Sequence, residues 1–195
     1  MKRLLLAKSW QLFLAVFVLP LLILFSGLFV PVYVLNGAYF FIAIPLSVVL
    51  SQVVVYLWMW SVGQKLYKQL NISSFFPNKA FRFFVAVPFI IILLVLVFWL
   101  WGAAILGSGQ FSMANILTGM LIFVIPLEIL FMASKFYCFY FVAKVIKSAE
   151  KNEGAQFESF TTDFIWLILF PLGLWFIQPR VNILAAKSDK NTTEA

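Results

Sequence analysis

Few residues in this chain could carry chemistry, and they surround one acidic side chain. Glu128 lies inside a long apolar segment, two residues after Pro126. A carboxylate at membrane depth is costly, so it marks a candidate functional site by default. Lys135 follows further along the same segment, and at about 100° per residue it falls within about 20° of the same helix face. The two side chains are about 10 Å apart along the helix axis, so we expect no direct contact between them.

A polar residue on a neighbouring helix could connect Glu128 with Lys135. Gln52 is the best candidate in the second apolar segment, with Ser47 and Ser51 just before it. Three roles stay open for Glu128: a neutral hydrogen-bonding group that holds helices together, a proton or ion site, or a contact with a partner subunit. The candidate buried polar cluster therefore consists of Glu128, Lys135, Gln52, Ser47 and Ser51.

Other kinds of site have no support in the sequence. The chain contains no histidine, which is the most frequent general base and metal ligand. The single cysteine, Cys138, excludes an intrachain disulfide and a cysteine-cluster metal site. No HExxH, GxSxG or glycine-rich phosphate-binding pattern is present. We therefore expect no catalytic residue, no cofactor, no metal ion and no enzymatic activity.

The environment of these residues follows from the composition. The chain is 64% hydrophobic and only 11% charged, whereas a soluble domain is closer to half apolar and a quarter charged. No Asp, Glu, Lys or Arg occurs from Ser9 to Gln64 or from Phe83 to Leu127. Each run is long enough for two helical crossings of about 20 residues. The segments are continuously apolar and do not alternate, which excludes strands of a membrane β-barrel.

Turn residues divide both runs into spans. Asn36-Gly37 interrupts the first run, and Gly107-Ser108-Gly109-Gln110 interrupts the second. The sequence therefore predicts an all-α membrane protein with four transmembrane helices, at about 10–35, 39–62, 83–106 and 114–134. The last of these helices is expected to continue as an interfacial extension over 135–148, where aromatic residues suit the membrane boundary.

The positions of the basic residues predict the orientation. They form three clusters, before the first span, between the second and third spans, and after the fourth span: Lys2, Arg3 and Lys8; Lys65, Lys68, Lys79 and Arg82; Lys144, Lys147 and Lys151. Basic residues of short loops stay on the cytoplasmic side. We expect a protein of the inner (plasma) membrane with a cytoplasmic N-terminus. Anionic lipid headgroups around Lys144, Lys147 and Lys151 are sufficient partners for the net charge of +7, without nucleic acid.

The C-terminal quarter contains a further apolar segment whose course is open between two alternatives. After a linker at 149–162, the segment 163–179 includes FPLGLWFIQPR, and a polar tail occupies 180–195. Its uncharged part, 164–177, would reach only about 21 Å as a straight helix, which is less than a membrane core of about 30 Å. Pro171 and Gly173 are expected to break it. A re-entrant or interfacial helix–break–helix with a cytoplasmic C-terminus and a short fifth crossing both stay open.

Residues 135–182 resemble a group of bacterial proteins. The quoted residues are FYFVAKVIKSAE at the end of the fourth helix and FPLGLWFIQPRVN after the linker. They look like the C-terminal part of small multi-pass membrane proteins of unknown function from bacterial genomes, with GLWFIQPR as the most specific run. The resemblance implies a bacterial inner-membrane protein and implies no activity or site residue.

The function most compatible with these features is that of a non-enzymatic accessory or scaffold subunit of a membrane assembly. Its expected partners are membrane lipids and a protein partner or a second copy of itself. The alternative is a small transporter or channel with a polar site around Glu128, and a membrane enzyme acting on lipid comes third. A polar cavity that reaches Glu128 would favour transport, whereas a dry bundle with an exposed surface incompatible with lipid would favour a subunit.

Overall fold

The computed structural model describes residues 5–26, 38–69, 71–107 and 118–193, and all regular elements in this part of the chain are helical. In chain order they are α2 (Ser9–Phe13), η1 (Leu14–Val18), α3 (Leu19–Ser26), α4 (Ala38–Trp60), η3 (Ser61–Leu66), α5 (Tyr67–Gln69), η4 (Ile72–Ser74), α6 (Lys79–Gly107), η5 (Met120–Val124), α8 (Ile125–Lys151), α9 (Phe157–Ile168) and α10 (Phe170–Thr193). The segments η1, η3 and η5 are π-helical, and η4 is a 3₁₀ turn.

Four helical segments are long and apolar enough to cross a membrane: Ser9–Ser26, Ala43–Leu66, Lys79–Gly102 and Leu121–Lys151. The predicted all-α fold with four transmembrane helices is therefore confirmed. The third helix begins at Lys79, a turn earlier than expected, because the residues before Phe83 continue the same helix. The end of the first expected span, the start of the fourth and the turn residues 36–37 and 108–110 lie outside the described residues.

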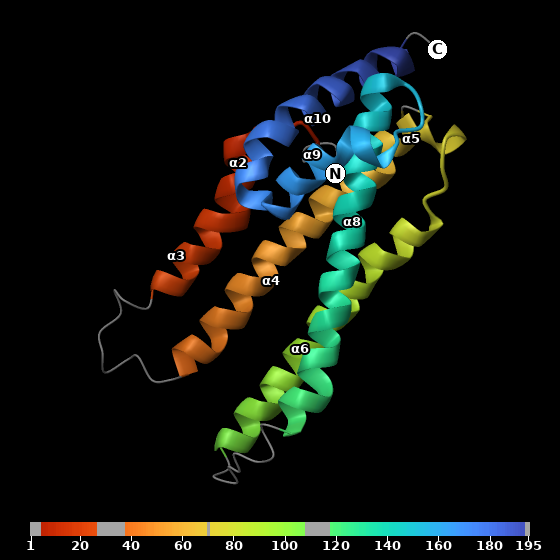
Figure 1. Ribbon diagram of the computed structural model, residues 1–195. Coiled ribbons are helices and arrows are strands. Elements are labelled where there is room, and N and C mark those ends of the chain that lie inside the picture. Colours follow the sequence, from red (N-terminus) through yellow and green to blue (C-terminus); the bar gives the residue numbers. More distant parts are fainter. Residues whose placement is uncertain (1–4, 27–37, 70, 108–117, 194–195) are drawn as a thin grey trace.

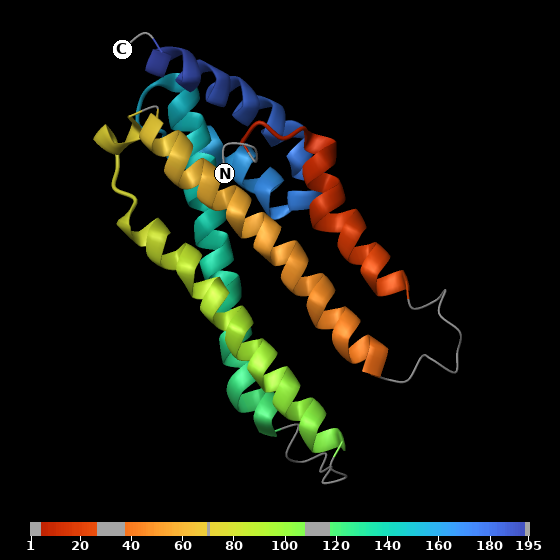
Figure 2. The ribbon, with the colours of Figure 1, turned by 180° about the vertical axis from the view of Figure 1, so that it is seen from behind.

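The spans pack side by side in chain order. Helix α3 packs against α4, α4 against α6, and α6 against α8. The two C-terminal helices, α9 and α10, lie between α2 and α8 near the end of the molecule that also carries α5 and the end of α8 (Figures 1 and 2). We call this end the basic end, because Lys65, Lys68 and Lys151 belong to it.

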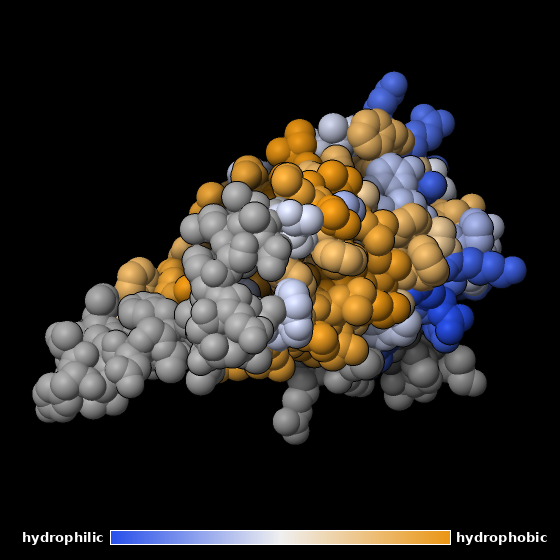
Figure 3. Space-filling view, turned by 90° about the horizontal axis from the view of Figure 1, so that it is seen from below, coloured by the Kyte–Doolittle hydropathy of each residue, from blue (hydrophilic) through white to orange (hydrophobic). Residues whose placement is uncertain are grey.

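Hydrophobic side chains cover most of the surface, as lipid contact requires. They dominate the face seen in Figure 3, and hydrophilic side chains gather at one edge of that view. Leu22 of α3, Leu93 of α6 and Ile129 of α8 are among the large apolar side chains that are well exposed. Since lipid tails are themselves apolar, such exposure needs no further cover in a bilayer.

Tight aromatic packing joins the spans near the basic end. The rings of Phe81 and Phe141 stack with centroids 4.3 Å apart. Gly63 lets the Phe81 ring lie directly on the backbone of η3, since a Cβ atom at position 63 would come within 2.3 Å of that ring. This close approach fixes α4, α6 and α8 against one another at this end.

The C-terminal quarter differs from the expected course at several points. Helix α8 continues to Lys151 and α9 begins at Phe157, so only 152–156 connect them, rather than the longer linker predicted at 149–162. The break between α9 and α10 lies at Leu169 and not at Pro171 or Gly173. Pro171 is accommodated in the first turn of α10, where its missing N–H leaves no helical bond unmade. Residues 180–193 are part of α10, because that helix packs against α2 and does not end at Arg180.

Gly173 has a different role from the one expected of it. A Cβ atom at this position would lie 1.8 Å from the carbonyl oxygen of Trp166, so only glycine allows α10 to approach α9 this closely. The rings of Trp166 and Phe176 stack beside the approach, with centroids 4.2 Å apart. Helices α9 and α10 therefore form a tightly closed helical hairpin, which we call the α9–α10 hairpin.

Candidate functional site

Lys135 and Gln52 connect α8 with α4 inside the bundle. The Lys135 ammonium donates a hydrogen bond to Gln52 Oε1 at 3.4 Å. It also lies about equally far from the ring centroids of Phe131 and Phe139, at 6.0 and 5.9 Å. The interhelical bridge suggested by the sequence is thus present on the Lys135 side, and aromatic faces supply part of the environment of this cation.

Glu128 lies on the same side of α8 but has no such bridge. Its side chain is exposed, and within the described part of the chain it has no hydrogen-bond or ion-pair partner. The carboxylate lies two helical turns from Lys135 along α8, at a separation of about 10 Å along the helix axis. The sequence suggested that Gln52 could connect Glu128 with Lys135. In the structure Gln52 bonds Lys135 only.

The face of α8 that carries Glu128 is covered by the α9–α10 hairpin near Phe139 but is uncovered near Glu128. Phe139 falls within about 20° of the direction of Glu128 at about 100° per residue, and it stacks on Phe170 of the α9–α10 hairpin at 6.0 Å. The hairpin ends near this level. Glu128 lies about 16 Å further along the axis of α8, beyond the reach of the hairpin.

Helix α4 shows the same change along one of its faces. Val48 and Val55 share a direction within about 20°, yet Val55 is 3% exposed whereas Val48 is 53% exposed. That direction lies between Gln52, which bonds α8, and Trp58, which bonds α10. We call the uncovered surface that carries Val48, Gln52, Glu128 and Met132 the open face.

Two hydroxyl groups of the helices that carry the open face are buried without a hydrogen-bond partner. They belong to Tyr56 and Ser134. Tyr56 is enclosed by the rings of Phe89 and Phe131, each with its centroid 5.9 Å from that of Tyr56. Sequence reasoning did not identify either residue, although a tyrosine in the middle of a charge-free run and a serine beside Lys135 were visible signals.

The two predicted serines do not join Lys135 or Glu128. The buried Ser47 hydroxyl donates to the carbonyl oxygen of Ile44 in its own helix at 2.8 Å. Ser51 is half-buried on α4, and in the described ranges it makes no hydrogen bond to Lys135 or Glu128. Of the five predicted residues, the structure brings Gln52 and Lys135 into contact and places Glu128 on the same face.

The three lysines expected on lipid headgroups have neighbours within the protein. Lys144 Nζ lies 4.5 Å from the centroid of the Phe76 ring. Lys147 is 3.5 Å from Glu150, and Lys151 is 3.7 Å from Glu153. These contacts lie at the basic end, where exposed ion pairs are worth little stability.

A second polar centre, which the sequence did not reveal, surrounds Gln178 of α10. Its amide is fully buried. Gln178 Oε1 accepts a hydrogen bond from the Trp58 indole at 2.7 Å. Gln178 Nε2 donates to the carbonyl oxygens of Leu5 and Ala7 at 3.1 and 2.9 Å, and lies 2.9 Å from Asn182 Oδ1. This amide joins α4, α10 and the segment before α2.

Arg180 forms a third polar centre, two residues further along α10. Its guanidinium bonds both oxygens of Glu150, at 2.6 and 2.8 Å, and both oxygens of Asp163, one of them at 2.9 Å. The hydrogen bonds to Asp163, and next those to Glu150, raise the pKa of Arg180 above its ordinary value. The guanidinium therefore stays charged and joins the end of α8 to the middle of α9 and of α10.

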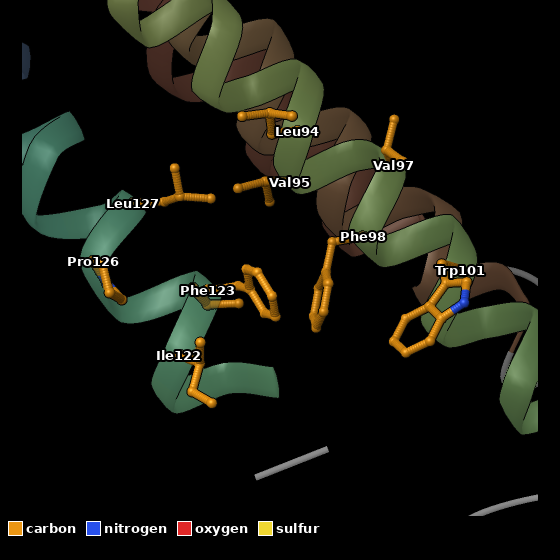
Figure 4. A pocket seen from close by; sticks show the side chains of 10 residues that line it. Leu94, Val95, Val97, Phe98, Trp101, Ile122, Phe123, Pro126 and Leu127 are labelled. Carbon is orange, nitrogen blue, oxygen red and sulfur yellow. The ribbon is translucent and has the colours of Figure 1, made fainter. Parts of the chain in front are cut away.

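A groove between the outer parts of α6 and α8 offers no chemistry. It encloses about 510 Å³ and is lined by apolar side chains, among them Leu94, Phe98, Trp101, Phe123 and Pro126 (Figure 4). Within the described residues there is also no group of three or more acidic, histidine or cysteine side chains that could hold a metal ion. The open face is thus the strongest candidate site in the membrane region.

The fold defines a multi-pass helical membrane protein. No protein-family model, no curated protein and no solved structure matches the chain. The resemblance of residues 135–182 to small bacterial membrane proteins stays an expectation from the sequence.

Proposed function

We propose that this protein is a non-enzymatic subunit or scaffold of a membrane assembly, and that a helix of another membrane protein covers the open face. The observation that carries the proposal is Glu128, which is exposed inside Leu121–Lys151, a segment long and apolar enough to cross a membrane, and which has no bonding partner in the described chain. A charged side chain facing lipid at the centre of a span costs about 3 kcal/mol on insertion scales, which sets the upper bound for Glu128. A partner helix with a donor group at the same depth removes this cost.

The chemistry of the open face favours a different chain over a second copy of this one. Copies inserted in the same orientation are related by an axis along the membrane normal, so residues of equal depth meet across the interface. Glu128 would face Glu128, since Lys135 lies about 10 Å away in depth. Two carboxylates at short range repel each other unless they share a proton. The partner group is therefore a basic or amide side chain of another protein.

Transport is the second candidate, and one observation favours it. The hydroxyls of Tyr56, one helical turn after Gln52 in α4, and of Ser134, next to Lys135 in α8, are buried without a hydrogen-bond partner, as groups on a polar path could be. Against transport, the rings of Phe89 and Phe131 enclose Tyr56, so the hydroxyls open onto an apolar surrounding.

Photo-crosslinking in living cells tests the subunit proposal. A benzophenone amino acid is placed at Val48 or Met132 on the open face, and at Leu93 or Leu100 of α6 as exposed controls. We expect a protein adduct from the open-face positions only, with a mass other than that of two copies of the 22.3 kDa chain. Adducts at twice that mass, or with lipid alone at all four positions, contradict the proposal.

Substitutions of Glu128 separate the subunit proposal from transport. Glu128→Gln keeps both donor and acceptor capacity, so we expect the adduct at Met132 to persist. Glu128→Leu removes that capacity, and we expect the adduct to fall several-fold. If Glu128→Gln instead keeps the adduct pattern but abolishes an ion flux measured in vesicles, the transport proposal is the correct one.

A further inference from the structure

The contacts of the α9–α10 hairpin indicate how deeply it enters the membrane and on which side. We propose that it is a re-entrant hairpin, inserted halfway into the lipid leaflet at the basic end, and that acyl chains of this leaflet cover its outer side. This inference does not depend on the proposed function, because it concerns different residues and a different partner.

The ends of the hairpin lie on the same side of the membrane. Arg180 bonds Glu150 at the end of α8 and Asp163 in α9. These bonds keep the polar part of α10 beside the end of the fourth span. A fifth crossing would carry Arg180 to the opposite surface, away from Glu150, and is incompatible with these bonds.

The length of the hairpin limits its depth. Leu169, at the turn, lies about 16 Å from Arg180 along α10 and about 9 Å from Asp163 along α9, at about 1.5 Å per residue. The turn of the hairpin can therefore reach no deeper than the middle of a membrane core about 30 Å thick.

One side of the hairpin packs on the membrane spans. The Phe170 ring contacts Trp58 of α4 at 5.2 Å and Phe139 of α8 at 6.0 Å, measured between centroids. Trp175 lies 6.1 Å from Phe13 of the first span. These partners belong to the segments long and apolar enough to cross a membrane, so the turn lies at the depth of the spans and not above them.

The other side of the hairpin is apolar and exposed. Its residues are Ile165, Ile168, Leu169, Leu172, Trp175 and Phe176, and Leu172 is the most exposed of them at 60%. The surface is continuous with the lipid-facing surface of the first span, because Trp175 packs beside Phe13. Lipid is therefore the partner that this surface fits.

A break inside a membrane requires that polar backbone groups be paired, and both groups of Leu169 at the turn of the hairpin are. The Leu169 N–H donates to the carbonyl oxygen of Ile165 at 3.1 Å. The Leu169 carbonyl accepts from the N–H groups of Leu172 and Gly173, at 3.0 and 2.9 Å. Pro171 has no N–H to satisfy.

Fluorescence quenching in vesicles tests the inference. Single cysteines at Leu172, Leu93 or Ile183, in a Cys138→Ala background, carry an environment-sensitive dye. The vesicles contain phosphatidylethanolamine and phosphatidylglycerol, with nitroxide lipids labelled near the headgroup or near the chain end. We expect the Leu172 dye to be quenched more by the shallow nitroxide, the Leu93 dye in mid-span more by the deep one, and the Ile183 dye by aqueous iodide only.

Three other results would overturn the re-entrant hairpin. Deep quenching at Leu172, equal to that at Leu93, places this residue at the membrane centre and contradicts a hairpin inserted only halfway into the leaflet. Iodide quenching at Leu172 places the hairpin in water, and quenching by neither agent places protein on its surface. Sidedness gives an independent check: an impermeant thiol reagent should label Ile183→Cys and Ser73→Cys from the same side of sealed vesicles, whereas a fifth crossing separates them.

Discussion

Gln178 satisfies polar groups that would otherwise be buried without partners. The Trp58 indole and the carbonyl oxygen of Leu5 bond to its amide, and the carbonyl oxygen of Ala7 accepts from it as well as from Asn182 Nδ2. Each group left unsatisfied at such a site costs about 1 to 3 kcal/mol. We therefore expect Gln178→Met to lower the free energy of unfolding by about 3 kcal/mol in detergent titrations. The exposed Gln156 makes no side-chain cap bond, and Gln156→Met should change this energy by less than about 0.5 kcal/mol. Equal effects of the two substitutions would contradict the role of Gln178.

At the scale of residues, helical spacing predicted some of the site and not the rest. The common face of Glu128 and Lys135 follows from their separation along one helix, and Gln52 was the best polar candidate in a span without charges. Gln178 could not be recognised in this way. Two of its partners are backbone carbonyls more than 170 residues away in the chain, and a backbone carbonyl leaves no pattern in a sequence.

At the scale of elements, the close packing of α9 on α10 requires that residue 173 have no Cβ atom, as is the case for glycine. A methyl group there would meet the Trp166 backbone at 1.8 Å, and backbone cannot move aside as a flexible side chain can. Overpacking of this kind costs about 1 to 3 kcal/mol. We expect Gly173→Ala to lower the unfolding free energy by about that amount.

Gly102 provides a matched control for that substitution. It lies inside α6, and a methyl group added to it would have no atom within 4 Å. Gly102→Ala should therefore be neutral or slightly stabilising through helix propensity. If both glycines tolerate alanine equally in the same detergent titration, α9 and α10 do not approach as closely as described.

The position of the break shows what sequence signals mean at this scale. Proline and glycine together suggested a break at 171–173, yet both lie inside α10. Proline is compatible with a first helical turn as well as with a break, and glycine serves close packing as well as bending. Whether such a proline or glycine breaks a helix or lies within one depends on which helix packs beside it. The sequence alone does not identify that neighbour.

At the scale of the whole molecule, the basic residues predict which end faces the cytoplasm. Cysteines introduced at Asn36 or Ser108 should react with an impermeant thiol reagent in intact cells lacking Cys138, whereas a cysteine at Asn71 should react only after lysis. Intact-cell labelling restricted to Asn71 would reverse the orientation.

The number of spans was predictable because charge-free runs of that length fit only a bilayer. The packing of the spans against one another was not predictable, because positions that face lipid and positions that face another helix are equally apolar in this chain. Val48 and Val55 illustrate the difficulty: the same residue type, on the same side of α4, is exposed in one turn and buried two turns later.

The bond between Gln178 and the segment before α2 also sets the order in which the protein can assemble. During synthesis the N-terminal residues leave the ribosome first, and α10 follows after every span has been made. Until then the carbonyl oxygens of Leu5 and Ala7 lack the donors of Gln178 and Asn182 that bond them in the folded protein. Neighbouring spans such as α3 and α4 can pair as they are inserted, but the segment before α2 bonds to α10 only afterwards. A ribosome that stops before Gln178 therefore releases a chain whose spans are inserted and whose N-terminal segment has nowhere to dock.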